Sequence, residues 1–271
     1  MAAIAVAVVG AAVAIKCLAL FGLLFSLCSK ALAAPPIAIG AEDDWYPFTG
    51  THQQQLQGLS VELVEAAFAA SNTPITFKVY PYARCMHLAR IGKLAGCFNT
   101  AADASLSKDF AFSAEPLFSA PIVLWQHKND PRQPRHLSDL AKQQVAVTLG
   151  YEYGPLFDQY PDIHRIPVRK DLYGLRMLAN QRVDYSVAYL GTTLALFERY
   201  PKLQKHVRAS LVVATPTLHL SFSRQHPQGA EAKRRFDAGL KQLRLSGQYQ
   251  QIIARWQRFL PTEPVAPDLL P

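Results

Sequence analysis

Short apolar runs alternate with longer amphipathic repeats along the chain from residue 37 onward. An apolar run at 37–40 (IAIG) and an alternating run at 75–80 (ITFKVY) have the length and period of strands. Between them, residues 61–68 repeat apolar side chains every three or four positions, as in a helix packed on a sheet. Ser60 stands at the start of this repeat and is expected to cap the helix. The segment therefore predicts a strand, a helix and a strand.

The same alternation continues along the chain. We expect a helix over 83–91, ended by a left-handed Gly92, and then a strand over 96–100 (GCFNT). A second set of elements follows a charged, proline-rich stretch at 126–135. Its strands are expected at 144–150, 163–168 and 184–190, its helices at 154–160, 172–183 and 192–200, and two final helices at 229–245 and 249–259.

The change in composition near residue 126 indicates that the chain crosses into a second lobe, and residues 211–223 would carry it back. These two crossings predict an α/β protein with two lobes and a ligand cleft between them. Lobe 1 is expected to comprise residues 36–124 plus 217–260, and lobe 2 residues 125–216. The proline-rich residues 261–271 are expected to form a loose tail.

Five short motifs follow one another within the first lobe. They are WYPF at 45–48, Gly58, PYAR at 81–84, GKLAG at 92–96 and FSAEP at 112–116. In this order they resemble the motifs of the bacterial extracellular solute-binding proteins of family 3, the polar-amino-acid type, which are the receptors of ABC importers. The resemblance continues to about residue 256 and so covers nearly all of the chain after its first 36 residues.

The resemblance implies a type II periplasmic-binding-protein fold, in which each lobe is a mixed sheet flanked by helices. It also implies a monomer that binds a small molecule and then meets an ABC-transporter permease in the inner membrane. No cofactor is implied. The formal net charge of +8 would suit a nucleic-acid partner, but the basic residues are spread along the chain, and we expect none.

Aromatic and polar residues at the expected strand ends are the candidate ligand contacts. Tyr46 and Phe48 lie in an aromatic loop flanked by acidic and amide residues, and we expect them to stack on a ligand, although each would serve equally as core. Asn99 and Thr100 end a lobe 1 strand, and Tyr189 ends a lobe 2 strand.

Two further candidates lie where a helix begins. Arg84 offers a guanidinium fork for a carboxylate, and the alternative is a salt bridge within its own lobe. The turn 150–154 (GYEYG) joins a strand to a helix, so its backbone N–H groups can receive an anion. Tyr151 and Tyr153 within this turn favour a ligand site over a plain connection.

The chain departs from the family it resembles at the usual grips for an amino acid. Where the family has an arginine before the FSxP segment, this chain reads SLSKDFAFS, with only Lys108 close by. The aspartate that holds the amino group falls near Tyr189, and Ala95 replaces an aspartate in the first-lobe turn. We therefore expect no preference for standard α-amino acids, and favour a planar or carboxylate-bearing solute.

Enzymatic function is the main alternative. The histidines lack the HxxxH and HExxH spacings of zinc sites and no GxSxG elbow is present, so we expect neither a metal nor catalysis. Some exported proteins that look like this family, of the cyclohexadienyl-dehydratase type, are lyases, and such a reaction would need Glu42, Asp44 or Glu152 as general acid. A rim salt bridge explains each of these carboxylates equally well. A ligand-sensing partner of a membrane signalling protein is a further alternative.

The first 33 residues have the layout of a secretory signal peptide. They contain no acidic residue, place Lys16 before an apolar run at 17–28, and end in an A-x-A site at 31–33. A membrane anchor is the alternative, although it would bury the lysine. The signal peptide predicts a periplasmic protein. It also leaves Cys85 and Cys97 as the cysteines of the exported chain, which predicts a disulfide between them in an oxidising compartment.

The leader makes a direct prediction about the exported protein. We expect its first residue to be Ala34, because cleavage follows the A-x-A site. Intact-mass measurement on a periplasmic extract should find this terminus. Recovery of the full-length chain in the membrane fraction would contradict it.

Overall fold

The computed structural model describes residues 35–52 and 54–260. The predicted signal peptide at 1–33 and the predicted tail at 261–271 lie outside the described residues. Within the described part of the chain, no helix combines the length and apolar character needed to cross a bilayer.

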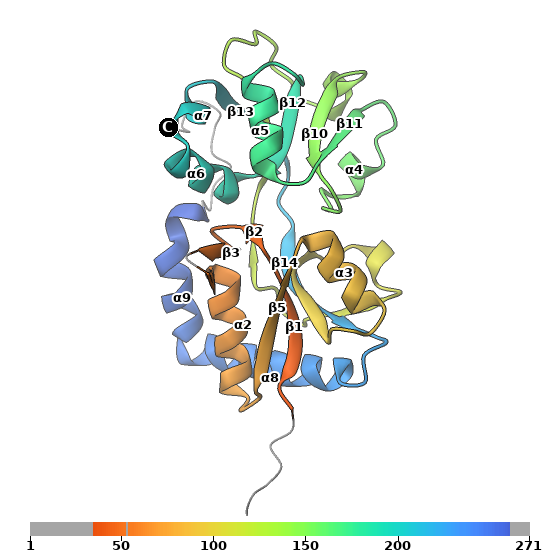
Figure 1. The fold of residues 1–271 in the computed structure, drawn as a ribbon, viewed down its shortest axis with the longest axis vertical. Coiled ribbons are helices and arrows are strands. Elements are labelled where there is room, and N and C mark those ends of the chain that lie inside the picture. Colours follow the sequence, from red (N-terminus) through yellow and green to blue (C-terminus); the bar gives the residue numbers. More distant parts are fainter. Residues whose placement is uncertain (1–34, 53, 261–271) are drawn as a thin grey trace, which may run out of the picture. The chain divides into compact units, whose positions relative to one another are not determined.

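The first lobe is built on a mixed sheet in which β1 (Ile37–Glu42) is the central parallel strand (Figure 1). Strands β5 and β6 pair with β1 in parallel, and β14 pairs with β6 in the antiparallel sense. The strand order is β5 (Ile75–Tyr80), β1, β6 (Gly96–Ala101), β14 (Thr217–Ser223) and β7 (Phe110–Phe112), with β8 (Phe118–Ser119) also paired with β14.

Helices cover both faces of this sheet because the side chains of β1 alternate between two cores. Ile37 and Ile39 belong to the large core that contains residues of α2 and α8, whereas Ala38 packs into the small core of α3. Phe68 of α2 meets Phe236 of α8 with ring centroids 5.3 Å apart. The helices are α2 (Leu59–Ala70), α3 (Tyr82–Arg90), α8 (Gly229–Ser246) and α9 (Gln248–Trp256).

Helix α2 is capped differently from the prediction. Its N-cap is Gly58, and no side chain caps it. Gly58 has φ 137°, and a side chain there would collide with the backbone at Phe48, so only glycine fits. The hydroxyl of Ser60 instead donates to the side-chain oxygen of Asn99 at the end of β6. The expectation of a capping serine was therefore wrong, because Ser60 lies inside the helix and faces the sheet.

The second lobe is a mixed sheet in which one strand, β9, runs antiparallel to both of its neighbours and the other four strands share one direction. Trp125 and Phe197 meet in its core with centroids 5.5 Å apart. The strand order is β11 (His164–Val168), β10 (Gln144–Thr148), β12 (Tyr185–Tyr189), β9 (Ile122–His127) and β13 (Val207–Ala214), and the helices are α4 (Pro155–Asp158), α5 (Asp171–Ala179), α6 (Leu190–Arg199) and α7 (Pro201–Gln204).

Two short connections join the sheets, from β8 to β9 and from β13 to β14. This confirms the predicted two-lobe α/β fold. The predicted boundary between residues 124 and 125 falls inside β9, all of which pairs with strands of the second sheet, and the boundary between 216 and 217 falls just before β14. The exact residues at which each lobe ends stay a prediction.

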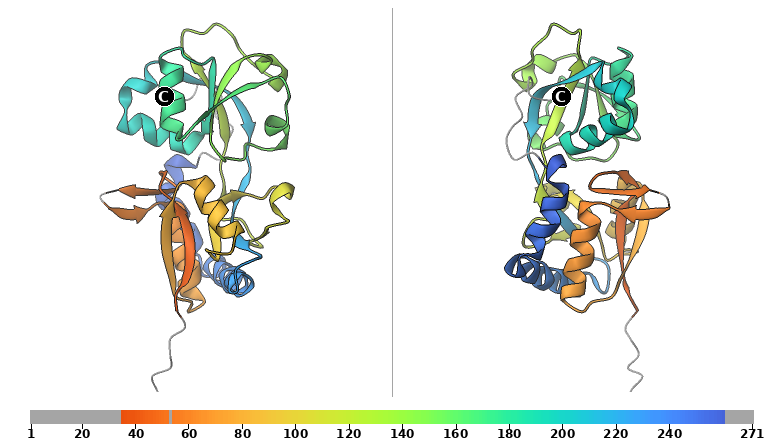
Figure 2. Two further views of the ribbon diagram at one scale, coloured as in Figure 1. Left: turned by 45° about the vertical axis from the view of Figure 1, so that its right-hand side comes forward. Right: turned by 90° about the vertical axis from the view of Figure 1, so that its left-hand side faces the viewer.

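Smaller elements complete the fold. A three-stranded sheet follows β1 directly and carries the aromatic loop, and Figure 2 shows it projecting from the end of β1. Its strands are β2 (Asp44–Trp45), β3 (Thr49–His52) and β4 (Gln55–Gln57), and the short 3-10 turns are η1 (Ala104–Leu106), η2 (Leu137–Leu140) and η3 (Gln257–Phe259).

The predicted disulfide between Cys85 and Cys97 is confirmed. It ties α3 to β6, with the two Cα atoms 6.1 Å apart. Both residues are fully buried, and a side chain at Gly40 on β1 would collide with the sulfur of Cys85. The bond thus fixes α3 against the centre of the first sheet.

Reduction of this disulfide should destabilise the protein. We expect the free energy of unfolding to fall by about 3 kcal/mol, because the bond closes a short loop in the unfolded chain. Urea denaturation with and without a reductant measures the difference. The double variant Cys85→Ala/Cys97→Ala is the control, since its stability should not respond to reductant. An unchanged midpoint for the reduced wild-type protein would contradict the prediction.

Candidate functional site

Five aromatic side chains meet where the two sheets end. Trp45 comes from β2 and Tyr82 from the start of α3, both in the first lobe, and Tyr189 is the last residue of β12 in the second. Trp45 and Tyr189 make an edge contact with centroids 4.9 Å apart, so the contact joins the lobes. With Tyr151 and Tyr153 from the turn after β10, these residues form what we call the aromatic cluster.

The turn after β10 places two of these tyrosines. Gly150 and Gly154 both have positive φ, 84° and 100°, and so reverse the backbone on either side of the tyrosines. The backbone N–H of Thr148 donates to the Tyr153 hydroxyl at 2.7 Å, which holds this ring under the turn. The ring of Tyr151 extends to the first lobe, where its centroid lies 5.4 Å from that of Tyr82.

Two hydrogen bonds run between the lobes in opposite senses. The hydroxyl of Tyr151 in the second lobe donates to the carboxyl group of Glu42, the last residue of β1. The hydroxyl of Tyr82 in the first lobe donates to Oε2 of Glu152 in the second, at 2.8 Å. At the rim, Lys170 Nζ pairs with Asp44 Oδ2 at 2.6 Å, and both side chains are more than a third exposed. Each lobe therefore supplies a donor and an acceptor for the other.

Asp171, the first residue of α5, is the third carboxylate near the cleft. The Thr148 hydroxyl donates to its Oδ1, while its Oδ2 has no hydrogen-bond partner among the described residues. Asp171 is 6% exposed, as is Glu42. The indole N–H of Trp45 also lacks a partner within this part of the chain. We call Glu42, Glu152 and Asp171 the acidic cluster.

Burial raises the pKa of each carboxyl in the acidic cluster. The pKa of Glu152 rises to about 7, mainly through burial, against the opposing effect of the Tyr82 hydrogen bond. Burial likewise raises the pKa of Asp171 to about 7, and its hydrogen bond from Thr148 opposes this. The pKa of Glu42 lies well above its ordinary value, because burial outweighs the Tyr151 hydrogen bond and Asp171 adds to the effect. The cluster is therefore partly protonated at neutral pH.

Comparison with known proteins identifies the family. The model of the bacterial extracellular solute-binding proteins, family 3, matches residues 37–259. The chain belongs to this family.

Solved structures of similar fold agree with the two-lobe architecture of this solute-binding protein. A mutant of ArgBP from T. maritima has a TM-score of 0.71 at 19% identity, covering 82% of this chain and 95% of its own. A histidine kinase sensor domain similar to periplasmic binding proteins has a TM-score of 0.73 at 19% identity, covering 83% and 96%. The substrate-binding protein of an amino acid ABC transporter has a TM-score of 0.70 at 15% identity, covering 82% and 99%. A search of curated protein sequences finds no significant match.

The structure brings three of the predicted contacts into the aromatic cluster of this solute-binding protein, namely Tyr151, Tyr153 and Tyr189. Asn99 and Thr100 lie at the end of β6, where both are buried and bonded within their own lobe. Asn99 Nδ2 donates to the Thr49 hydroxyl at 2.6 Å, and the Thr100 hydroxyl lies 2.9 Å from that of Ser221. In this structure their side chains therefore stabilise the packing inside lobe 1.

The other predicted contacts do not join the cluster. Phe48 is fully buried and stacks on Phe118 with centroids 5.0 Å apart, so it is core in this structure. Tyr46 packs edge-on against Trp256 at 5.9 Å and borders an adjoining cavity. Arg84 is exposed, with its guanidinium 5.6 Å from the Tyr80 ring centre. The alternative considered for Arg84, a salt bridge within its own lobe, is also not seen among the described residues.

Several residues of the site lacked a strong sequence signal. The sequence predicts only rim salt bridges or general acids at Glu42 and Glu152, yet both accept hydrogen bonds from tyrosines of the opposite lobe. Tyr82 lies in the PYAR motif, whose arginine is the more obvious candidate for a ligand contact. Asp171 has no sequence signal, because an acidic residue at the start of a helix is common. The tyrosine-rich turn at 151–153 is the sequence feature that indicates buried hydrogen-bond acceptors in the facing lobe.

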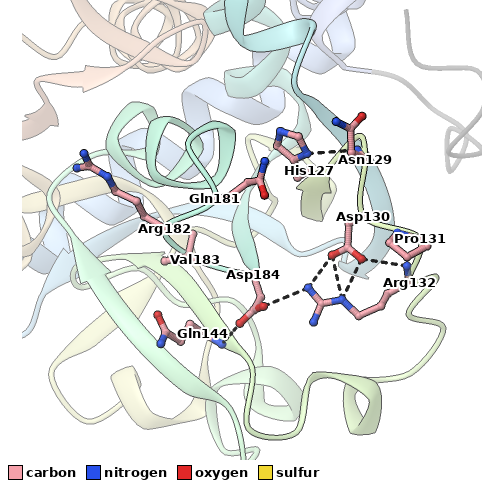
Figure 3. A pocket seen from close by; sticks show the side chains of 10 residues that line it. All are labelled: His127, Asn129, Asp130, Pro131, Arg132, Gln144, Gln181, Arg182, Val183 and Asp184. Carbon is pink, nitrogen blue, oxygen red and sulfur yellow. Dashed lines mark hydrogen bonds and ion pairs between the residues drawn. The ribbon is translucent and has the colours of Figure 1, made fainter.

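Two cavities border the second lobe. One, of about 540 Å³, lies between the β2–β3 hairpin and helices α5 and α6, and Asp171, Tyr46 and Thr192 are among its lining residues. The other, of about 470 Å³, lies among the end of β9, the loop at 129–132, the start of β10 and the turn at 181–184 (Figure 3). In it the Arg132 guanidinium pairs with Asp130 and Asp184, so the central charges of this second cavity are already matched.

The raised pKa of Glu152 predicts how stability changes with pH. Its ordinary pKa is 4.5 and its folded value about 7, so between these the folded state holds a proton that the unfolded state has released. The free energy of unfolding should therefore decrease as pH rises through this window, by at most about 3 kcal/mol from this group.

Chemical denaturation at about pH 5 and about pH 8 tests this. Glu152→Gln keeps an acceptor for Tyr82 but cannot titrate, so its stability should fall less over this range than that of the wild-type protein. Glu115→Gln, at an exposed position between β7 and β8, is the control and should keep the wild-type slope. Equal slopes for Glu152→Gln and wild-type would contradict the assignment.

Proposed function

We propose that the protein captures a small polar or aromatic solute in the periplasm, by closing its two lobes around it. The observation that carries this proposal is the pair of reciprocal hydrogen bonds, from Tyr151 to Glu42 and from Tyr82 to Glu152. Both join residues on the facing ends of the two sheets. Such contacts form only when the lobes are together, which is how a hinged receptor senses closure.

Capture works by differential affinity. A solute that touches both lobes stabilises the closed state, and the closed state differs in surface from the open one. The two connections between the sheets, from β8 to β9 and from β13 to β14, supply the hinge. A membrane partner that recognises the closed surface then receives the solute or its signal.

The membrane partner is proposed to be an ABC-transporter permease. One similar structure is that of the substrate-binding protein of an amino acid ABC transporter, which supports this role. Another is a histidine kinase sensor domain, which supports a sensor as the second candidate. Both partners would use the same closure of the lobes. Pull-down of membrane proteins of its own cell with the closed, ligand-bound protein distinguishes a permease partner from a sensor partner.

A lyase of the cyclohexadienyl-dehydratase type is a further candidate. The observation that favours it is the pKa of Glu152, about 7, which suits a general acid at neutral pH. Binding without turnover remains our proposal, because both glutamates of the cleft already hold the lobes together through tyrosines. Loss of carbon dioxide from a bound cyclohexadienyl acid, measured with the purified protein, would show the lyase instead.

A true ligand should stabilise the protein measurably. At a hundredfold excess over its dissociation constant it adds about 2.7 kcal/mol to the free energy of unfolding, which raises the melting temperature by roughly 5 to 10 °C. Native mass spectrometry of the periplasmic protein identifies candidates, and a thermal-shift series with them measures the rise. Standard α-amino acids should give smaller shifts, because Tyr189 and Lys108 stand where the family has its charged grips.

Tyr189→Ala should abolish the shift, since this ring touches Trp45 across the cleft. Leu156→Ala, at a side chain that is 79% exposed on α4, is the matched control and should keep it. A ligand whose stabilising effect survives Tyr189→Ala and Tyr151→Ala would place binding elsewhere.

A further inference from the structure

We propose that the solute is a compact organic cation, such as an amine or a guanidinium compound, held by Glu42, Glu152 and Asp171 against the aromatic cluster. This inference rests on the proposed capture between the lobes and names the class of ligand. It replaces the carboxylate-bearing solute favoured by the sequence, because Arg84 is exposed outside the cluster.

The charge of the site carries the first part of the argument. None of the hydrogen bonds or ion pairs found for the three carboxylates within residues 35–52 and 54–260 involves a lysine, arginine or histidine. The adjacent Lys170 pairs with Asp44 at the rim. Buried carboxylates are ordinarily matched by a cation or protonated. A cationic ligand would supply that match, whereas an anionic one would add to the repulsion.

An unmet acceptor gives the second, independent observation. Asp171 is more than nine-tenths buried, yet its Oδ2 has no partner in the described part of the chain. The cavity of about 540 Å³ between the β2–β3 hairpin and α5 and α6 is lined by Asp171 together with Lys170 and Arg199, and by neither glutamate of the acidic cluster and no residue of the aromatic cluster. The unpartnered oxygen of Asp171 is itself shielded from solvent, so the ligand is placed among the three carboxylates and not in this cavity. A buried acceptor without a partner is the position at which an ammonium or guanidinium N–H can donate.

The aromatic rings add a surface that attracts cations. Trp45 and Tyr189 meet edge to face, and Tyr82 and Tyr151 do the same at 5.4 Å. Trp45, Tyr82 and Tyr189 are buried in this structure, so their ring faces become available to a ligand where the lobes part. A cation within about 6 Å of such a face is attracted by the ring quadrupole. Acidic groups and aromatic faces thus favour the same class of ligand.

Binding of a cation should release protons. The three carboxyls are partly protonated at neutral pH when the cleft holds no cation, and a bound positive charge favours their ionised forms. The groups that face these carboxyls are mainly acidic or phenolic. Glu42 has Tyr151, Asp43, Asp44 and Asp171 around it, and Glu152 has Tyr82, Asp103 and Asp158. Asp171 has Thr148 and Asp44 beside it, and Lys170 directly precedes it in the sequence.

Three four-carbon probes of equal length test the ligand class: putrescine, 1,4-butanediol and succinate. With the full exported protein at neutral pH, we expect putrescine to raise the melting temperature and the other two to leave it unchanged. Isothermal titration in phosphate and in HEPES buffer should show different apparent enthalpies, which reports proton release on binding. Agmatine and choline extend the cationic set to a guanidinium and a quaternary ammonium.

Variants locate the effect. Asp171→Asn keeps the shape of the side chain and should weaken binding of the preferred cation about tenfold or more. Glu42→Gln is a second variant for the case that Asp171→Asn does not fold. Glu115→Gln removes an exposed charge outside the cluster and should bind as the wild-type protein does.

The outcomes distinguish the inference from the function on which it rests. A shift with succinate or 1,4-butanediol but with no cation would overturn the cationic ligand and leave capture between the lobes standing. Cation binding that is unaffected by both Asp171→Asn and Glu42→Gln would overturn the site. If no probe binds and no small molecule accompanies the native protein in its mass spectrum, both the inference and the proposed function fail.

Discussion

Burial of carboxylates without a neighbouring basic side chain is the constraint on which the cleft depends. Glu42 ends a buried strand and Glu152 lies in a tight turn, and each is offset by a tyrosine hydroxyl from the opposite lobe. A neutral donor stabilises a buried carboxylate only in part, so protons or another cation must complete the match. The proximity of the lobes, the protonation of the cleft and the charge of its contents are consequently linked.

The fold brings these groups together through the ends of its strands. Glu42, Tyr189 and the turn after β10 all lie at carboxyl ends of strands, which is where open α/β sheets present ligands. The disulfide at Cys85 fixes α3 one turn after Tyr82, so the tyrosine that reaches Glu152 begins from a rigid helix. Preorganisation of this kind lowers the entropy that closure must overcome.

The sequence predicted the elements well and the orientation of individual side chains less well. Local pattern is enough for three features. The alternation of apolar and polar residues predicts strand β5, Gly92 predicts the end of α3, and an oxidising compartment predicts the disulfide. Arg84 follows Tyr82 by two positions, which on a helix places them on different sides, and the motif does not say which one faces the cleft. Asp171 had no signal, because an acidic residue in a first helical turn is common and its burial depends on distant strands.

In the proposed capture, charge inside the cleft gives the protein two ways to close. Without a cation, bringing the lobes together removes Glu42 and Glu152 from water, and raised pKa values mean that proton uptake accompanies this step. Acidic conditions therefore favour closure of the empty protein, and alkaline conditions oppose it. A bound cation takes the place of those protons, so closure around it remains favourable where the empty protein opens. The same three carboxyls that make empty closure sensitive to pH would thus make closure selective for positive charge.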